Sequence, residues 1–127
     1  MPRSRIKLGA FGESYARSHL GRLGYQVLAS NVRMKSGEID ILAQDGATLV
    51  FIEVRTRRGG RFGTPEESIS FKKAERLARL AGEHLLSLEA KPQAWRIDVV
   101  AIDVAPDGSV LRLEHVKNAV GEGGLVP

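Results

Sequence analysis

Two periods of hydrophobic positions alternate along the chain and predict two helices and five strands. Over residues 5–23 the apolar side chains recur at about 100° per residue, which predicts an amphipathic helix that ends at Gly24. The apolar side of this helix consists of Leu8, Phe11, Tyr15, Ala16, Leu20 and Leu23. A second helix is predicted by the same spacing of Phe71, Ala74, Leu77, Ala78, Ala81, Leu85 and Leu88.

Shorter runs rich in Val, Ile and Phe, bounded by turn residues, predict the strands. These runs cover 25–34, 38–44, 48–55, 97–104 and 110–116. Asp45-Gly46 is a strong hairpin signal between the second and third runs. The segment between the third and fourth runs is long enough for a crossover, so these two strands can be parallel. The order of elements predicts an α/β fold, with a mixed β-sheet flanked by helices.

The length of 127 residues suits one domain with one core. Residues 1–120 are expected to form this domain, and the glycine-rich residues 121–127 a flexible tail. Thr64-Pro65-Glu66-Glu67 has the form of a capping box with proline in the first helical position, which predicts a helical turn there.

Composition excludes several classes of protein. Hydrophobic residues make up 43% of the chain and charged residues 27%, so wholesale disorder is excluded. The absence of cysteine excludes disulfides, zinc–thiolate sites and thiol nucleophiles. No run reaches the ~18 apolar residues of a membrane helix, and the N-terminal residues lack the apolar stretch of a signal peptide. We therefore expect a soluble cytoplasmic protein.

Charge is distributed in blocks along the chain. The net charge is +4, but residues 1–35 carry seven basic residues and one acid, and residues 55–79 carry eight and three. Between these blocks, residues 36–54 contain four acids and no basic residue. This pattern suits a polyanion held by basic flanks around a site that binds a cation.

The acidic block contains a candidate metal site. Because alternate residues of a strand share a face, Glu38 and Asp40 are expected to point away from Ile39 and Ile41. If Asp45-Gly46 is the two-residue loop, then the paired positions sum to 91. This register places Glu38 opposite Glu53, with Asp40 diagonal to Glu53 on the same face.

Like charges across a ladder are destabilising, so a positive group should compensate these acids. Mg²⁺ or Mn²⁺ fits, because a hard cation prefers carboxylate and water oxygens. The alternative is a solvent-exposed face on which the acids pair with Arg55, Arg57 or Lys35. Arg55 favours the metal site, because it shares the face of Glu53 and its guanidinium can reach a phosphate bound to the metal.

These residues resemble a known family. Glu13 on the first helix, the run Gly37-Glu38-Ile39-Asp40-Ile41 and the run Phe51-Ile52-Glu53-Val54-Arg55-Thr56-Arg57 are similar to the motifs of the PD-(D/E)xK, or restriction-endonuclease-like, superfamily. Over about residues 8–120 the chain more closely resembles the YraN-like family of uncharacterised bacterial proteins, which are similar to archaeal Holliday-junction resolvases.

The resemblance implies a metal-dependent nuclease fold. Asp40 and Glu53 would be the ligands of Mg²⁺ or Mn²⁺, Glu13 a helper on the helix, and Arg55 the catalytic cation. The family usually has lysine where this chain has Arg55, and arginine serves mainly as an electrostatic clamp. The expected function is therefore a nuclease acting on DNA, with branched or structured DNA as candidate substrates. The alternative is a non-catalytic nucleic-acid-binding protein on the same scaffold.

Basic residues around the glycine-rich loop are expected to bind nucleic acid, DNA rather than RNA, through its backbone. They are Arg57, Arg58, Arg61, Lys72, Lys73 and Arg76. Lys72, near the helix start, is expected to approach a scissile phosphate. The alternative for the helical members is a solvated face with Glu75 and Glu83. Junction resolution needs two active sites, so a homodimer is expected by analogy.

Three further residues have simpler expected roles. The alternative for Glu13 is an ion pair with Arg17 on the same helix. Asp98, within a buried run, is expected to be a structural partner of Arg96 or of a backbone group, and His19 a core histidine.

Overall fold

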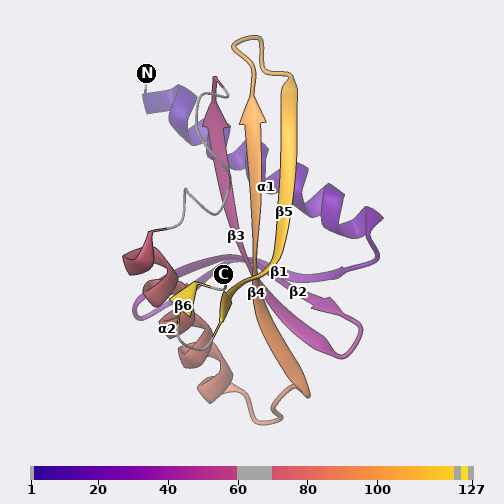
Figure 1. The fold of residues 1–127 in the computed structure, drawn as a ribbon, viewed down its shortest axis with the longest axis vertical. Coiled ribbons are helices and arrows are strands. Elements are labelled where there is room, and N and C mark those ends of the chain that lie inside the picture. The colour runs from indigo at the N-terminus through magenta and orange to yellow at the C-terminus, as the bar shows by residue number, and fades with distance from the viewer. Residues whose placement is uncertain (1, 60–69, 122–123, 126–127) are drawn as a thin grey trace.

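The computed structural model describes residues 2–59, 70–121 and 124–125, and in it a mixed sheet lies between two helices (Figure 1). Along the chain the elements are α1 (Pro2–Arg22), β1 (Gln26–Met34), β2 (Gly37–Asp45), β3 (Thr48–Arg58), α2 (Phe71–Ser87), β4 (Ala94–Val104), β5 (Val110–Gly121) and β6 (Gly124–Leu125). The strands are adjacent in chain order, from β1 to β6. The predicted α/β class and the two predicted helices are therefore confirmed.

Strand directions make the sheet mixed. β3 and β4 are parallel, and every other neighbouring pair is antiparallel. The connection between β3 and β4 contains α2, as expected for a crossover. β5 is longer than predicted and pairs with the two-residue β6, which the sequence pattern did not predict. Of the predicted tail, residues 122–123 and 126–127 lie outside the described residues.

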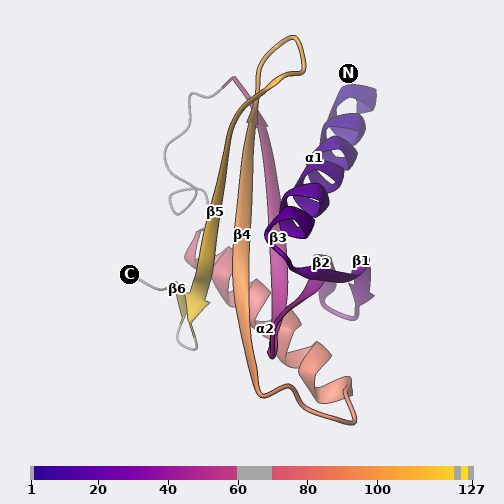
Figure 2. The same cartoon turned by 90° about the vertical axis from the view of Figure 1, so that its right-hand side faces the viewer.

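Each helix covers one face of the sheet, as the side view shows (Figure 2). On one face Leu77, Leu80 and Ala81 of α2 pack with inward residues such as Phe51 and Ile97. On the other face lie Ala16 and Leu20 of α1, with Val50, Ile52, Val100 and Ile102 of the sheet. Residues that alternate along β3 therefore point to different helices.

Local sequence fixes how each helix starts or ends. α1 ends before Gly24, whose φ of +92° is readily adopted by glycine. α2 is capped by Ser70, whose hydroxyl accepts a hydrogen bond from the backbone N–H of Lys73 at 3.1 Å. The helical turn predicted at Thr64-Pro65-Glu66-Glu67 lies outside the described residues.

α1 approaches β3 closely at Gly12. A Cβ atom at this position would lie 1.8 Å from the Thr56 hydroxyl oxygen. Only glycine therefore allows this approach, which places the next residue, Glu13, against the sheet. Within the described residues, neither helix is both long and apolar enough to cross a membrane.

Candidate active site

The β2–β3 hairpin sets the position of the acidic residues, and its register differs from the expected one. Asp45 pairs with Thr48, so Gly46 and Ala47 form the loop and paired positions sum to 93. The expectation that Glu38 lies opposite Glu53 is wrong. Because the difference is two residues, the side chains within the ladder, from Ile41 to Asp45, keep the faces that the alternation predicts.

Glu38 lies at the β1 side of β2 instead. It pairs with Arg33 in the ladder, and an oxygen of its carboxylate is 3.9 Å from a guanidinium nitrogen of Arg33. An exposed pair of this kind contributes little to stability. Glu38 therefore does not face Glu53, although its charge acts to raise the pKa of Glu13.

β2 and β3 are paired next to the hairpin turn and separate further from it, between Ile41 and Asp40. The β2–β3 ladder ends at the pair Ile41 and Ile52. Beyond it, the backbone N–H of Val54 donates a hydrogen bond at 2.9 Å to Oδ2 of Asp40. The Asp40 side chain thus supplies the acceptor that a continuing strand would have supplied.

This separation also corrects the expected alternation of the two isoleucines of β2. Ile41 packs in the cluster under α1, whereas Ile39 packs in the cluster under α2, so they do not share one face. Asp40 lies between them at the point of divergence. It borders a cleft on the α1 side and a small crevice on the α2 side.

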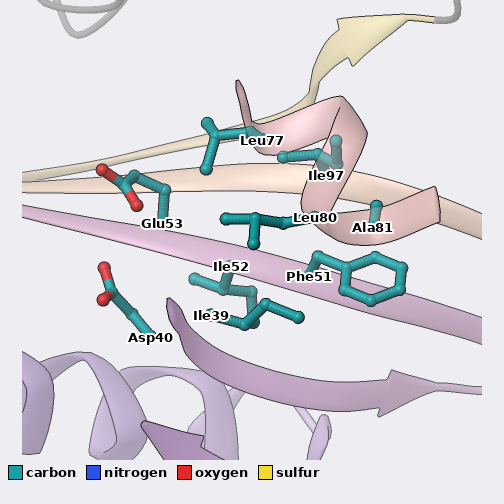
Figure 3. Close-up of a pocket in the computed structure, with 9 residues that line it drawn as sticks. All are labelled: Ile39, Asp40, Phe51, Ile52, Glu53, Leu77, Leu80, Ala81 and Ile97. Atoms are coloured by element: carbon teal, nitrogen blue, oxygen red, sulfur yellow. The ribbon is translucent and has the colours of Figure 1, made fainter. Parts of the chain in front are cut away.

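Asp40 and Glu53 point toward one another across the gap between the strands (Figure 3). Glu53 is only 7% exposed. Burial raises the pKa of both carboxyl groups, and the neighbouring Glu53 helps to raise that of Asp40 to about 7. The hydrogen bond between the two side chains acts to raise the pKa of Asp40 and to lower that of Glu53. The predicted convergence of these two acids is therefore present in the structure.

Three cations surround Glu53. The Lys73 ammonium lies 3.2 Å from Oε2 of Glu53, and a guanidinium nitrogen of Arg55 lies 3.8 Å from the same atom. Arg55 and Arg76 both act to lower the pKa of Glu53, against the effect of burial. Arg55 is thus on the face of Glu53, as predicted. Lys72, the lysine expected near the reacting centre, is exposed, and its neighbour Lys73 lies there instead.

Helical phase explains which lysine points inward. Lys73 precedes the buried Leu77 by four residues, so both lie on the side of α2 that faces the sheet. Lys72 is one residue, or about 100°, away from that side. The four-residue spacing of Lys73 and Leu77 is visible in the sequence. It identifies Lys73 as the inward-facing lysine once Leu77 is known to face the sheet.

Glu13 approaches Asp40 from the other face of the sheet. A cleft of about 320 Å³ is lined by Leu8, Gly9, Glu13, Asp40, Val54 and Thr56. Burial raises the pKa of Glu13, whereas Arg17, whose guanidinium lies 3.9 Å from Oε1, lowers it. Within the described part of the chain, Oε1 of Glu13 is buried and accepts no hydrogen bond. Glu13 therefore combines the ion pair with Arg17 and a position in the cleft.

The other predicted nucleic-acid contacts are separated from one another. Arg57 lies 3.3 Å from Asp103 in an ion pair on the sheet, and Arg58 donates weakly to the carbonyl oxygens of Ala105 and Pro106. Arg76 is half-buried near Glu53. Arg61 lies outside the described residues.

The residues present fit a hard divalent cation held by few protein ligands. No group of three or more His, Cys, Asp or Glu side chains within residues 2–59, 70–121 and 124–125 is arranged to hold a metal ion. Asp40 and Glu53 form a pair, however, and Mg²⁺ often takes only one or two carboxylates, with water and phosphate completing its shell. Oxygen donors alone, with the unsatisfied Oε1 of Glu13 nearby, favour Mg²⁺ or Mn²⁺ over softer metals.

The fold and the site together define an α/β protein with a buried acidic pair between two diverging strands. Comparison with known proteins then identifies the family. The chain belongs to the uncharacterised protein family UPF0102, whose family model matches residues 12–102. The match includes α1 from Gly12, the acidic pair and α2.

Several relatives are similar over nearly their whole length. A UPF0102 protein of Symbiobacterium thermophilum is 49% identical over 113 residues, which are 89% of this chain and 95% of the relative. UPF0102 proteins of Herpetosiphon aurantiacus and Roseiflexus castenholzii are 48% and 45% identical, over 83% and 93% of this chain and 88% and 96% of their own lengths. The resemblance to the YraN-like family is thereby confirmed.

Proposed function

We propose that this protein is a divalent-metal-dependent nuclease that hydrolyses phosphodiester bonds in DNA. The observation that carries the proposal is the convergence of Asp40 and Glu53 in a setting where their charge is costly. When both carboxyl groups of such a pair are ionised, the folded protein is destabilised unless a cation binds there. The resemblance to the PD-(D/E)xK superfamily supports the same assignment.

Each residue of the site has a role in this reaction. Asp40 and Glu53 would hold Mg²⁺ or Mn²⁺, which supplies Lewis-acid polarisation of the phosphate and activation of water. Arg55, beside Glu53, stabilises the negative charge that develops on the phosphoryl oxygens. Glu13 faces Asp40 across the cleft, where its carboxylate can orient the attacking water.

Basic residues around the site provide affinity without sequence selection. Arg76 lies near Glu53, and Lys72 is exposed on the outer side of α2, so both can contact successive phosphates. Such binding depends on salt and extends to any polyanion of suitable shape. We propose DNA as the partner and a homodimer as the acting form, since cutting a junction symmetrically requires two sites.

Cleavage assays test the proposal directly. The protein is incubated with four-way junction, flap, single-stranded and duplex DNA, and with RNA of the same sequences, in Mg²⁺ or Mn²⁺. We expect cleavage of at least one DNA by the wild type, and none by Asp40→Ala or Glu53→Ala. Glu89→Ala removes an exposed acid outside the site and should cleave normally. Equal cleavage by all variants would contradict the assignment of the site.

A second candidate is a nucleic-acid-binding protein without catalysis. It is favoured by Arg55, which stands where the superfamily that this sequence resembles usually has lysine, because arginine stays charged and serves mainly as an electrostatic clamp. In that case no DNA is cleaved, although Asp40→Ala and Glu53→Ala bind DNA as well as the wild type. Arg55→Lys would then be expected to create or raise activity.

A further inference from the structure

Lys73 is the ammonium group closest to the acidic pair among the described residues. Its Nζ lies 3.2 Å from Oε2 of Glu53, and its side chain is 23% exposed. It comes from α2, whereas Glu53 and Arg55 come from β3. The site therefore contains a lysine, but one that is about 20 residues from the strand motif along the chain.

The start of α2 holds Lys73 in this place. The backbone N–H of Lys73 donates to the Ser70 hydroxyl at 3.1 Å, which fixes the first turn. The next residue, Ala74, is fully buried, and Leu77 packs in the cluster under α2. The helix cannot rotate without exposing these residues, so the Lys73 stem is directed at the sheet.

Lys73 and Arg55 differ in what they can do beside a carboxylate. Arginine is a rigid planar fork that stays charged, whereas lysine is a compact ammonium on a flexible four-carbon stem. Both cations now approach the same oxygen of Glu53. An ammonium and a divalent cation compete for that oxygen, because each neutralises the same charge.

We infer that Lys73 is the catalytic lysine of this site, supplied from the helix in place of the lysine missing at position 55. This inference rests on the proposed function. In the metal-free protein the Lys73 ammonium neutralises Glu53. With a divalent cation held by Asp40 and Glu53, the Lys73 ammonium would be released from Glu53, and its flexible stem would let it reach a phosphate oxygen and stabilise the charge of the transition state together with Arg55.

The test compares Lys73→Met and Lys73→Arg with two other variants of α2. Lys73→Met should lower kcat by about a hundredfold with little change in KM for DNA, and Lys73→Arg should recover part of the loss. Lys72→Met should instead raise KM and leave kcat nearly unchanged. Arg79→Met removes an exposed charge from the same helix and should behave as the wild type.

Calorimetry with Mn²⁺ and no DNA gives a second readout. Removing the competing ammonium in Lys73→Met should tighten Mn²⁺ binding by about threefold to tenfold, whereas Arg79→Met should leave it unchanged. Thermal unfolding of each variant checks that it is folded, and Lys73→Arg keeps the charge if the methionine variant is unstable.

The outcomes separate the inference from the proposed function. Cleavage and Mn²⁺ affinity of Lys73→Met equal to those of the wild type would overturn the role of Lys73 alone. Tighter Mn²⁺ binding by Lys73→Met with no cleavage by the wild type would overturn the catalytic role and the nuclease proposal, but would support the competition. No Mn²⁺ uptake by any variant would overturn both.

Discussion

The side chains of Asp40 and Glu53 are hydrogen-bonded to one another, and this contact acts to raise the pKa of Asp40 and to lower that of Glu53. Glu53 is buried and Asp40 is half-buried, and the pKa of Asp40 is raised to about 7. At alkaline pH Asp40 loses its proton, and two negatively charged carboxylates then face each other inside the protein. The acidic pair therefore links stability to pH.

Asp40→Asn should stabilise the metal-free protein at high pH. A carboxyl whose pKa is raised on folding contributes most below its unfolded value of 3.8, and that contribution is lost as pH rises through about 7. Asparagine has no such charge, and its Oδ1 can still accept from the Val54 N–H. We expect the variant to be more stable than the wild type by about 1–3 kcal/mol at pH 8.

Urea unfolding at pH 5 and pH 8 in the presence of EDTA measures this difference. The advantage of Asp40→Asn should be much larger at pH 8 than at pH 5. Glu89→Gln, at an exposed position, serves as the control. A constant difference between the two pH values would show that the charge of the pair does not cause the effect.

Mn²⁺ should reverse the order of stability at pH 8. A ligand that binds only the folded state stabilises it according to its concentration relative to Kd, by about 2.7 kcal/mol at a hundredfold excess. Mn²⁺ should thus raise the Tm of the wild type. Asp40→Asn and Glu53→Gln should show little increase, because each lacks one of the two proposed ligands.

Differential scanning fluorimetry over a Mn²⁺ series checks this prediction, with Ca²⁺ as a second oxygen-seeking ion. An equal Tm increase in the wild type and both variants would mean that the ion binds elsewhere on the protein.

Sequence alternation placed the acids correctly by face but not by register. Glu53 and Arg55 share a face because they are two residues apart on β3, whereas Asp40 meets Glu53 at the point where β2 has left the ladder. The Asp45-Gly46 signal marks a turn without deciding which of its residues pair. Asp45 pairs with Thr48, and this choice depends on packing across the whole ladder.

Other parts of the site could not be predicted because they depend on tertiary packing. The inward position of Lys73 follows from helical phase only after α2 is known to cover β3. The separation of β2 from β3 at Asp40, which opens the site to both faces, has no sequence pattern of its own. Long, strongly periodic elements were predictable, whereas the two-residue β6 was not.

Gly12→Ala should loosen the contact that carries Glu13 to the cleft. The added methyl group would lie 1.8 Å from Oγ1 of Thr56 and 3.0 Å from its Cβ, so the Thr56 side chain or α1 itself must shift. Overpacking of this kind costs about 1–3 kcal/mol of unfolding free energy. Since Glu13 is the next residue, we also expect cleavage to fall.

Gly9→Ala is the matched control on the same helix. A Cβ there meets nothing within 4 Å, and alanine favours the helix, so stability should stay the same or rise slightly. In urea unfolding, Thr56→Ala should recover part of the Gly12→Ala loss. Equal stability of the two glycine variants would contradict the close contact.

A second polar network, distant in sequence from the candidate site, joins β4, β5 and α1. Asp98 is completely buried and was expected to be a structural partner, which the structure confirms. Its carboxylate accepts from Nε of Arg96 at 2.9 Å, from the backbone N–H of Asn118 at 3.0 Å and from Nε2 of His115 at 2.8 Å. These bonds hold the pKa of Asp98 below its usual value.

Asp98→Asn should therefore be strongly destabilising. The amide has no charge to offset the half-buried Arg96 guanidinium, and its NH₂ group would face a hydrogen-bond donor. We expect a loss of about 3 kcal/mol in urea unfolding at pH 7. Glu114 is a half-buried acid that pairs with Arg112 on β5. Glu114→Gln should therefore cost at most about 1 kcal/mol of unfolding free energy. Similar losses in both variants would exclude a special role for Asp98.

His19 connects the network to α1 and should make stability fall in weak acid. Its Nε2 is hydrogen-bonded at 3.1 Å to Nδ1 of His115, whose other nitrogen is hydrogen-bonded to Asp98 at 2.8 Å. Burial, and then His115 and Arg22, lower the pKa of His19. The unfolded chain thus takes up a proton near pH 6.5 that the folded protein resists, and stability is lost as pH falls below this value.

His19→Gln should reduce that loss, because glutamine can donate to His115 and does not titrate. The measurement is the drop in Tm between pH 7.5 and pH 5.5, which we expect to be smaller in His19→Gln than in the wild type. His84→Gln, on α2 and in contact with Phe51, should retain the wild-type drop. If both variants show the wild-type drop, protonation of His19 does not limit stability, and the contact between α1 and β5 is insensitive to pH.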